Sequence, residues 1–285
     1  MSLLLGAVHV AAQSVEPAWL AIARADRLID QGEFGGAIRA FRRALDLSPD
    51  DPAALYGLGR AYRAVGDLDV AEDYFRRALD HQERFEVADT RLLVRYEIAA
   101  LYRIRRDFAR YEQELVSLVE DDPVTVDLTG VSAQRTLADH GLDRFLVLYR
   151  LPESGATAAR GMLAELLVGL GRYHAAAEHA TVAVLQAMTT VIEAVIRRDP
   201  TFEFAAVVDV MERASRYPEL REYLEESRLF RDLYYLAAAL WGERNRAAFE
   251  LWRVLPEIDP DGAWGDRAGR QLADPHPEPL LVPTR

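Results

Sequence analysis

The sequence contains neither cysteine nor lysine. Without cysteine among its 285 residues, the chain has no disulfides, thiolate metal sites or cysteine nucleophiles. All 34 basic residues are arginine, and they are outnumbered by 46 aspartates and glutamates, for a net charge of −12. An acidic surface repels phosphate backbones, so nucleic acid is not an expected partner. No run beyond the N-terminus reaches the roughly 18 apolar residues of a membrane span, so we predict no such span.

The N-terminal segment leaves two interpretations open. Residues 3–12 are mostly apolar and end in Val10, Ala11 and Ala12, small residues of the kind that precede a signal-peptidase cleavage site. The basic start and the usual length of a signal peptide are missing. Residues 1–14 are therefore either a signal-peptide remnant, which predicts export to the bacterial cell envelope or periplasm, or an apolar turn on the first helix. The second interpretation allows a cytoplasmic adaptor.

A hexapeptide, FRRALD, occurs twice, at residues 41–46 and again 34 positions later at 75–80. Just before the second copy, the i, i+3, i+4, i+7 spacing of one helical face is occupied by Leu55, Leu58, Gly59 and Tyr62. Gly66 interrupts this pattern, and a second helical pattern follows over residues 68–80. The sequence thus predicts a pair of helices joined by a short turn.

This helix pair resembles the tetratricopeptide repeat, a helix–turn–helix unit of about 34 residues. The positions typical of that repeat are filled in order by Leu55, Leu58-Gly59, Tyr62, Ala71, Phe75 and Ala78. The same register extends one repeat towards the N-terminus. A looser unit follows at residues 92–123, a clear one around 163–183 and a degenerate one around 235–260.

The resemblance implies an all-α fold, a right-handed solenoid of stacked antiparallel helix pairs in one continuous body, with a helical C-terminal extension. Three repeats are expected in residues 15–123, followed by an irregular helical connector over 124–156. Residues 157–274 are expected to form a degenerate repeat-like region that caps the stack. The proline-rich tail, 275–285, is expected to be extended.

No motif predicts a catalytic, cofactor or metal site. His174 and His179 are five positions apart, whereas two histidines that chelate one metal from a helix need a spacing of four. The two GLGR segments, at 57–60 and 169–172, lack the strand that leads into a phosphate-binding loop. We therefore expect a non-catalytic protein without a cofactor.

An enzyme, or a regulatory subunit of one, is the alternative from another class. Its catalytic residues would come from the irregular segment 124–160, where the most obvious titratable groups are His140, Asp143 and Glu153. Helix capping and ordinary surface positions explain the same residues. A packed pocket around His140 with a second titratable group would favour the enzyme.

The first helix of each repeat has a second row of residues, a stripe on the face that does not point into the core, and this row predicts a binding groove. The resemblance implies that this stripe lines a concave surface where peptides bind. Tyrosine, tryptophan and arginine are common anchors of interfaces, and arginine can hold a carboxylate through two hydrogen bonds. We therefore predict a protein or peptide partner with an acidic or C-terminal segment. The predicted groove residues are Trp19, Tyr56, Arg60, Arg63, Tyr96 and Arg103.

These residues also have a structural interpretation. They would pack against each other or against the chain's own tail, or simply face solvent. In particular, Asp26 of the first repeat is placed to pair with Arg60 of the second.

Overall fold

The computed structural model describes residues 16–122 and 131–280, and this part of the chain contains helices but no strand. The signal-peptide interpretation of residues 1–14 falls outside it. The prediction of an all-α fold is confirmed. The chain divides into two compact units, residues 1–101 and 102–285, where the repeat pattern predicts one body. The three-repeat region predicted from the sequence ends at residue 123.

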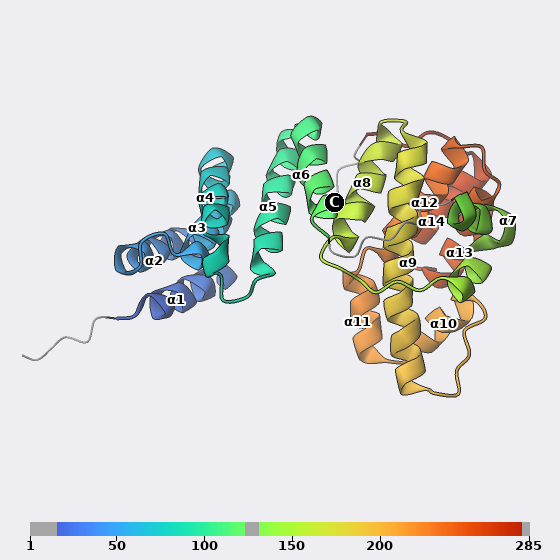
Figure 1. The fold of residues 1–285 in the computed structure, drawn as a ribbon, viewed down its shortest axis with the longest axis horizontal. Helices are drawn as coiled ribbons and strands as arrows, with labels where there is room; N and C mark the ends of the chain where they lie inside the picture. Colours follow the sequence, from blue (N-terminus) through green and yellow to red (C-terminus); the bar gives the residue numbers. More distant parts are fainter. Residues whose placement is uncertain (1–15, 123–130, 281–285) are drawn as a thin grey trace, which may run out of the picture. The chain divides into compact units, whose positions relative to one another are not determined.

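The first unit consists of antiparallel helix pairs, drawn from blue to cyan in Figure 1. Helix α1 packs against α2, α2 against α3 and α3 against α4, and α1 also contacts α3. A 3₁₀ turn, Gln82–Arg84, lies in the connector before α5. The helices are α1 (Ala18–Asp30), α2 (Phe34–Leu47), α3 (Pro52–Ala64), α4 (Leu68–Asp80) and α5 (Thr90–Arg105), and the boundary between the units lies inside α5.

The turns between paired helices repeat the same geometry. Gly32 and Gly66 follow α1 and α3 with φ of +76° and +85°, a left-handed conformation in which glycine avoids the Cβ clash of other residues. The start of α3 is also set locally. Asp51 accepts hydrogen bonds from the backbone N–H groups of Ala53 and Ala54 at 3.0 and 3.2 Å, which caps the helix.

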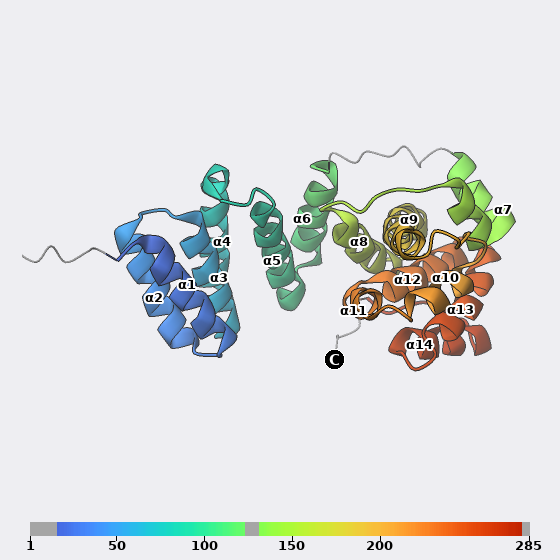
Figure 2. The same ribbon diagram turned by 90° about the horizontal axis from the view of Figure 1, so that it is seen from below.

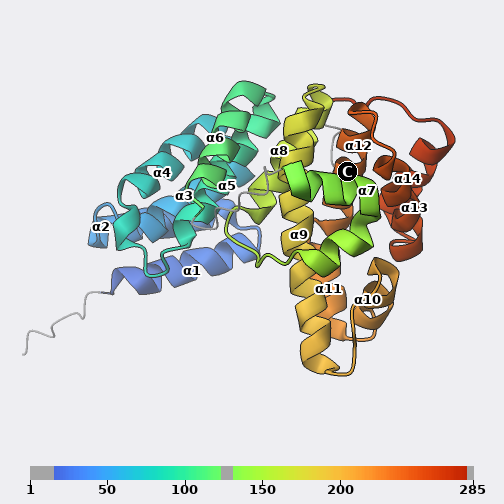
Figure 3. The same cartoon turned by 45° about the vertical axis from the view of Figure 1, so that its right-hand side comes forward.

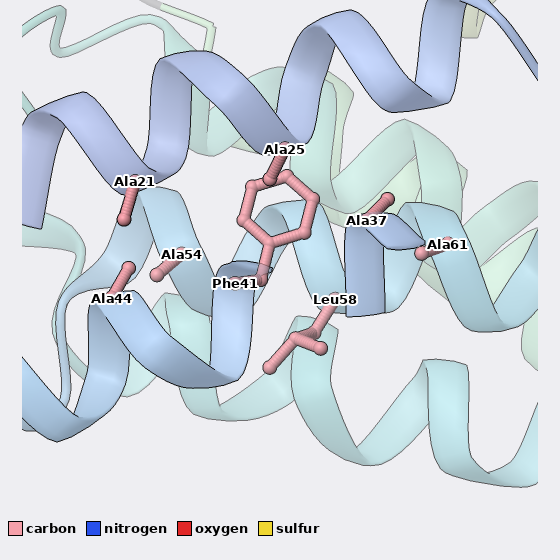
Figure 4. Packing of buried hydrophobic residues seen from close by; sticks show 8 residues of the cluster. All are labelled: Ala21, Ala25, Ala37, Phe41, Ala44, Ala54, Leu58 and Ala61. Carbon is pink, nitrogen blue, oxygen red and sulfur yellow. The ribbon is translucent and has the colours of Figure 1, made fainter. Parts of the chain in front are cut away.

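Two phenylalanines pack against two glycines in the core of the first unit. A Cβ at Gly57 would lie 2.1 Å from Phe41 Cζ, and one at Gly59 would lie 2.4 Å from Phe75 Cδ1. Both phenylalanine side chains are fully buried. Figure 4 shows Phe41 among small side chains from α1, α2 and α3. The glycines therefore allow the close helix contact on which the packing depends.

The second unit is built around a single long helix, α9. Figure 2 views α9 nearly along its axis, with α8, α12 and α10 around it. In Figure 3, α12, α13 and α14 form a neighbouring stack. The helices are α6 (Phe108–Glu120), α7 (Val131–Leu148), α8 (Thr157–Gly169), α9 (Tyr173–Arg198), α10 (Val207–Ala214), α11 (Pro218–Glu226), α12 (Leu229–Gly242), α13 (Ala247–Ile258) and α14 (Ala263–Ala273).

The prediction of no membrane span needs correction at α9. This helix has 26 residues and a mean hydropathy of 1.5 over its most apolar window, enough for a span by length and composition. Counting uninterrupted apolar residues missed it, because threonine, glutamine and histidine interrupt the run. The protein itself buries 78% of that window, as it does in a core helix.

The connector contains α7, which consists of two helical stretches that meet at Gly141. The backbone of this glycine is non-helical, with φ of +74° and ψ of 176°, so it ends the first stretch, and the second continues to Leu148. The run FLVLY, residues 145–149, is therefore mostly helical and not a strand. The long helix predicted over 174–198 is confirmed as α9, and the predicted break near Tyr217 separates α10 from α11.

Candidate functional site

Five of the six predicted groove residues belong to the first unit. Trp19, on α1, is the most exposed, with 67% of its surface accessible. Tyr56 is half-buried on α3, where its ring lies 6.0 Å from the ring of Phe75. Tyr96 is half-buried on α5. The stripe therefore combines an exposed apolar side chain with partly packed aromatic ones.

Both arginines of α3 have carboxylate partners one repeat away. Arg60 forms an ion pair with Asp26 of α1 at 3.4 Å, as the structural interpretation predicts. Arg63 forms a shorter one with Glu97 of α5 at 2.8 Å. The Arg60 guanidinium also lies 5.7 Å from the ring centroid of Tyr56, within the range of a cation–π contact. The stripe is thus a row of paired charges.

The acidic members of the row are partly removed from water. Burial raises the pKa of Asp26, against the effect of Arg60. Burial also raises the pKa of Glu97, against Arg63 and Arg60. The two pairs differ in exposure: the Asp26 side chain is 45% exposed, whereas that of Glu97 is 17% exposed. The two arginines are similarly exposed, at 31% for Arg60 and 38% for Arg63. The Arg60 pair is the longer of the two, and its carboxylate is the more accessible, so it is the pair that a ligand can more easily displace.

Arg103 lies apart from the other groove residues. It belongs to the second unit, where its guanidinium lies 3.6 Å from the buried carboxylate of Glu165 on α8. Arg228 and Arg231 of α12 also pair with Glu165. Arg228 additionally approaches Asp232 at 3.7 Å. Arg103 is therefore part of a buried charge cluster.

Sequence reasoning did not find this cluster. Glu165 and Asp232 are each only 2% exposed, and they lie on helices far apart in the chain. Burial is the main reason that the pKa of Asp232 is raised to about 7. The only local signal is the Arg228–Asp232 spacing of i, i+4, which is ordinary for a surface helix pair.

The titratable groups of the enzyme hypothesis do not gather at one place. His140 is exposed on α7. Asp143 accepts a hydrogen bond from the backbone N–H of Val207 at 2.8 Å. Glu153 accepts one from the Tyr223 hydroxyl, also at 2.8 Å. Asp143 and Glu153 thus hold neighbouring segments together.

The two histidines of HAAAEH have different surroundings. His174 is exposed beside a cavity of about 470 Å³, where its Nδ1 lies 2.7 Å from Glu243 and this hydrogen bond raises its pKa. His179 is largely buried, and desolvation lowers its pKa to about 4. Within residues 16–122 and 135–280, no group of three or more histidine, aspartate or glutamate side chains is placed to hold a metal ion.

Comparison with known proteins places the repeats. A family model described as "Tetratricopeptide repeat" matches residues 22–84. An uncharacterized protein of Treponema pallidum (strain Nichols) is 21% identical over 229 residues, which are 78% of this chain and 61% of that protein. The chain therefore spans less than two thirds of the length of that relative.

Solved structures show the same kind of fold. The apo form of RapI is similar with a TM-score of 0.52 and 12% identity, over 89% of this chain and 72% of that chain. YrrB, described as a TPR protein with an unusual peptide-binding site, has a TM-score of 0.46 and 17% identity, over 89% of this chain and 92% of its own. At 12% identity the likeness to RapI concerns the fold alone.

Proposed function

Residues 22–84 of this chain are tetratricopeptide repeats, and we propose that the protein is a non-catalytic scaffold that binds a partner peptide on the α1–α3–α5 stripe. The repeat fold is that of a protein–protein interaction scaffold. The observation that carries the finer proposal is the accessible Asp26–Arg60 pair beside Tyr56.

Arg60 is the proposed anchor. Its ion pair is long and both side chains are partly exposed, so the internal attraction is modest. An incoming carboxylate that accepts two hydrogen bonds from the guanidinium would replace a single 3.4 Å contact with a charge-assisted pair. Arg63 stays bound to Glu97 and keeps the surface in shape. The partner segment is therefore acidic, or ends in a free carboxylate.

Trp19 supplies an apolar contact on the same stripe. Its side chain is 67% exposed, and tryptophan is among the residues most enriched at interface anchor points. Leu93 of α5 is 54% exposed and occupies the corresponding position of the third repeat. The proposed ligand thus has a carboxylate for Arg60 and apolar side chains nearby.

Affinity capture with charge variants tests the proposal. Arg60→Glu places a negative charge at the anchor and should reduce recovery of the partner about tenfold, the loss expected for a charged hydrogen-bonded contact. Asp26→Asn removes the internal competitor and should increase recovery. Arg43→Glu, at an exposed position of α2, is the charge-matched control and should change nothing. Equal recovery of the partner with wild type and with Arg60→Glu would refute the proposal that the partner binds in this groove through Arg60.

Arg103→Glu is not a suitable companion variant. A glutamate there would face buried Glu165, and two buried like charges would destabilise the second unit itself. A lost partner could then not be distinguished from lost structure.

Location in the cell envelope is part of the proposal and rests on the apolar residues 3–12. Fractionation of cells that express the natural gene, followed by immunoblotting, tests it. Recovery with periplasmic or envelope markers is the expected result. Recovery with cytosolic markers would favour the adaptor alternative and leave the groove proposal unaffected.

A further inference from the structure

The segment that follows α14 is held by a side chain through its main chain. The Gln271 side-chain oxygen accepts a hydrogen bond from the backbone N–H of His276 at 2.9 Å, and its NH₂ group donates to the His276 carbonyl at 3.1 Å. This two-way contact imitates the pairing of a β-strand edge. It holds an extended segment regardless of which side chain His276 carries.

The same segment inserts a carboxylate into the second unit. Glu278 is only 8% exposed. Its Oε1 accepts hydrogen bonds from the Tyr234 hydroxyl and, at 2.7 Å, from Gln271. Its Oε2 pairs with Arg267 of α14. Burial raises the pKa of Tyr234, so that hydroxyl keeps its proton and remains a donor.

Aromatic rings fix the arginine that receives this carboxylate. The Arg267 guanidinium lies 4.8 Å from the ring centroid of Tyr234, 5.4 Å from Trp264 and 5.8 Å from Tyr235. Stacked in this way, the guanidinium loses little freedom when it binds a carboxylate. The receptor for Glu278 is therefore built in advance of its occupant.

Small and apolar surfaces complete the site on either side of Glu278. The Cα of Leu280 lies so near Gly169 of α8 that a Cβ on the glycine would be 2.7 Å away. Pro277 forms one wall of a cavity of about 480 Å³ that is also lined by Tyr173, Trp241 and Phe249. A larger apolar residue than proline would find room there.

We infer that the second unit contains a recognition site for extended acidic peptides, which residues 274–280 occupy in cis. The site takes a glutamate in an extended segment, with an apolar residue just before it and an aliphatic residue two positions after it. It lies in the second unit and is independent of the proposed groove of the first. The ligand in trans is a partner segment of this chemistry.

The attached segment, residues 274–280, and a partner peptide compete for the same site. A segment attached to its own site has an effective concentration of about a millimolar, so a free peptide of equal intrinsic affinity binds far more weakly to the intact chain. Weakening the attached segment should therefore strengthen binding in trans. A purely structural tail would show no such exchange.

The test measures binding of a fluorescent peptide, DPHPEPL (residues 274–280), to the full chain by anisotropy. Glu278→Gln in the protein removes the charge-assisted contacts of the attached segment. This variant should bind the wild-type peptide about tenfold or more tightly than the wild-type protein does. Equal affinity for both proteins would overturn the inference.

Two further comparisons locate the binding. In the Glu278→Gln protein, adding Arg267→Gln should abolish peptide binding, whereas adding Arg270→Gln, an exposed arginine of the same helix, should leave it unchanged. Circular dichroism confirms that each protein is folded. A peptide with glutamine in place of Glu278 should bind the Glu278→Gln protein at least about tenfold more weakly. Equal binding of the two peptides would also overturn the inference, and this comparison needs no further change to the protein.

Discussion

Phe75 and Gly59 are in such close contact that a Cβ on the glycine would lie 2.4 Å from the ring. They come from the two helices of one repeat, and their contact sets how near α3 and α4 can approach. The ring is fully buried and has no room to move aside.

We expect Gly59→Ala to destabilise the first unit by about 1–3 kcal/mol. Alanine gains about 1 kcal/mol over glycine in helix propensity, but overpacking against Phe75 outweighs this gain. Urea unfolding followed by far-UV circular dichroism measures the change. Gly35→Ala is the matched control, because its Cβ would meet nothing nearer than 3.9 Å, and it should be neutral or slightly stabilising. A Gly59→Ala protein as stable as wild type would contradict the packing described for α3 and α4.

His179 should make the second unit less stable in acid. Desolvation lowers its pKa to about 4, with Arg160 and Arg172 acting in the same direction. The unfolded chain takes up this proton near pH 6.5, so its stabilising effect is complete above that pH and is lost as the pH falls towards 4. The loss is about 3 kcal/mol. His179→Gln should remove this contribution and leave the opposing one of Asp232.

Urea unfolding at several pH values, followed by tryptophan emission, measures the stability of the second unit. Three of the four tryptophans, Trp241, Trp252 and Trp264, lie in that unit, and Trp19 lies in the first. His140→Gln, at an exposed position of α7, is the control and should keep the wild-type slope. If the unfolding free energy of His179→Gln changed with pH as that of wild type does, the neutral His179 would not contribute to the pH dependence.

Asp232 should make the second unit more stable in acid, the opposite of the effect of His179. Burial is the main cause that raises its pKa to about 7, against Arg228 and Arg231. The folded chain then holds a proton that the unfolded chain releases near pH 4, so this stability is complete below pH 4 and is lost as the pH rises through 7. The loss is about 4 kcal/mol.

The Asp232→Asn variant should therefore lose this contribution, so that its unfolding free energy rises from pH 4 to 7 more steeply than that of wild type, as measured by urea titration at several pH values. Asp266→Asn, on the exposed side of α14, should behave as wild type. Because His179 and Asp232 act in opposite directions, the wild-type profile should be flatter than that of either variant. Identical profiles for Asp232→Asn and wild type would contradict the prediction.

Gln186 connects α9 to the segment before α8. Its side chain is fully buried, donates to the Pro152 carbonyl at 3.0 Å and accepts from the Thr157 hydroxyl at 3.0 Å. Gln186→Leu would remove both of these part-buried hydrogen bonds and should cost about 1–2 kcal/mol. Thermal unfolding monitored by tryptophan emission measures this. Gln113→Leu, at an exposed position of α6, should stay within about 0.5 kcal/mol of wild type, and an equal result for both variants would show that the buried contacts are dispensable.

The parts of the fold that the sequence predicts are those set by local pattern. Gly59 stands where the repeat requires a small residue, and Gly66 ends α3 where a left-handed turn is needed. Both requirements operate within one helix pair. Gly141 acts locally as well, because its non-helical backbone separates the two helical stretches of α7. The packing of α7 against α13 and α9 has no such local signal.

The candidate sites divide in the same way. The Asp26–Arg60 pair was predictable, because both residues occupy equivalent helix positions 34 residues apart. Arg103 occupies an equivalent position too, yet it pairs with Glu165. Nothing in the repeat spacing relates α5 to α8. The burial of Glu278 likewise depends on a path of the chain after α14 that no periodic pattern records.

The hydropathy of α9 has a consequence for how the chain reaches its native state. A segment of this length and composition meets the basic requirements of a membrane span, and in the folded protein α8 and α12 make its most extensive contacts. These two helices lie on either side of α9 in the chain, so a ribosome delivers one cover before it and the other after it. Newly made α9 is consequently half-sheltered until α12 emerges, and during that interval it is a natural substrate for chaperones that hold exposed apolar segments.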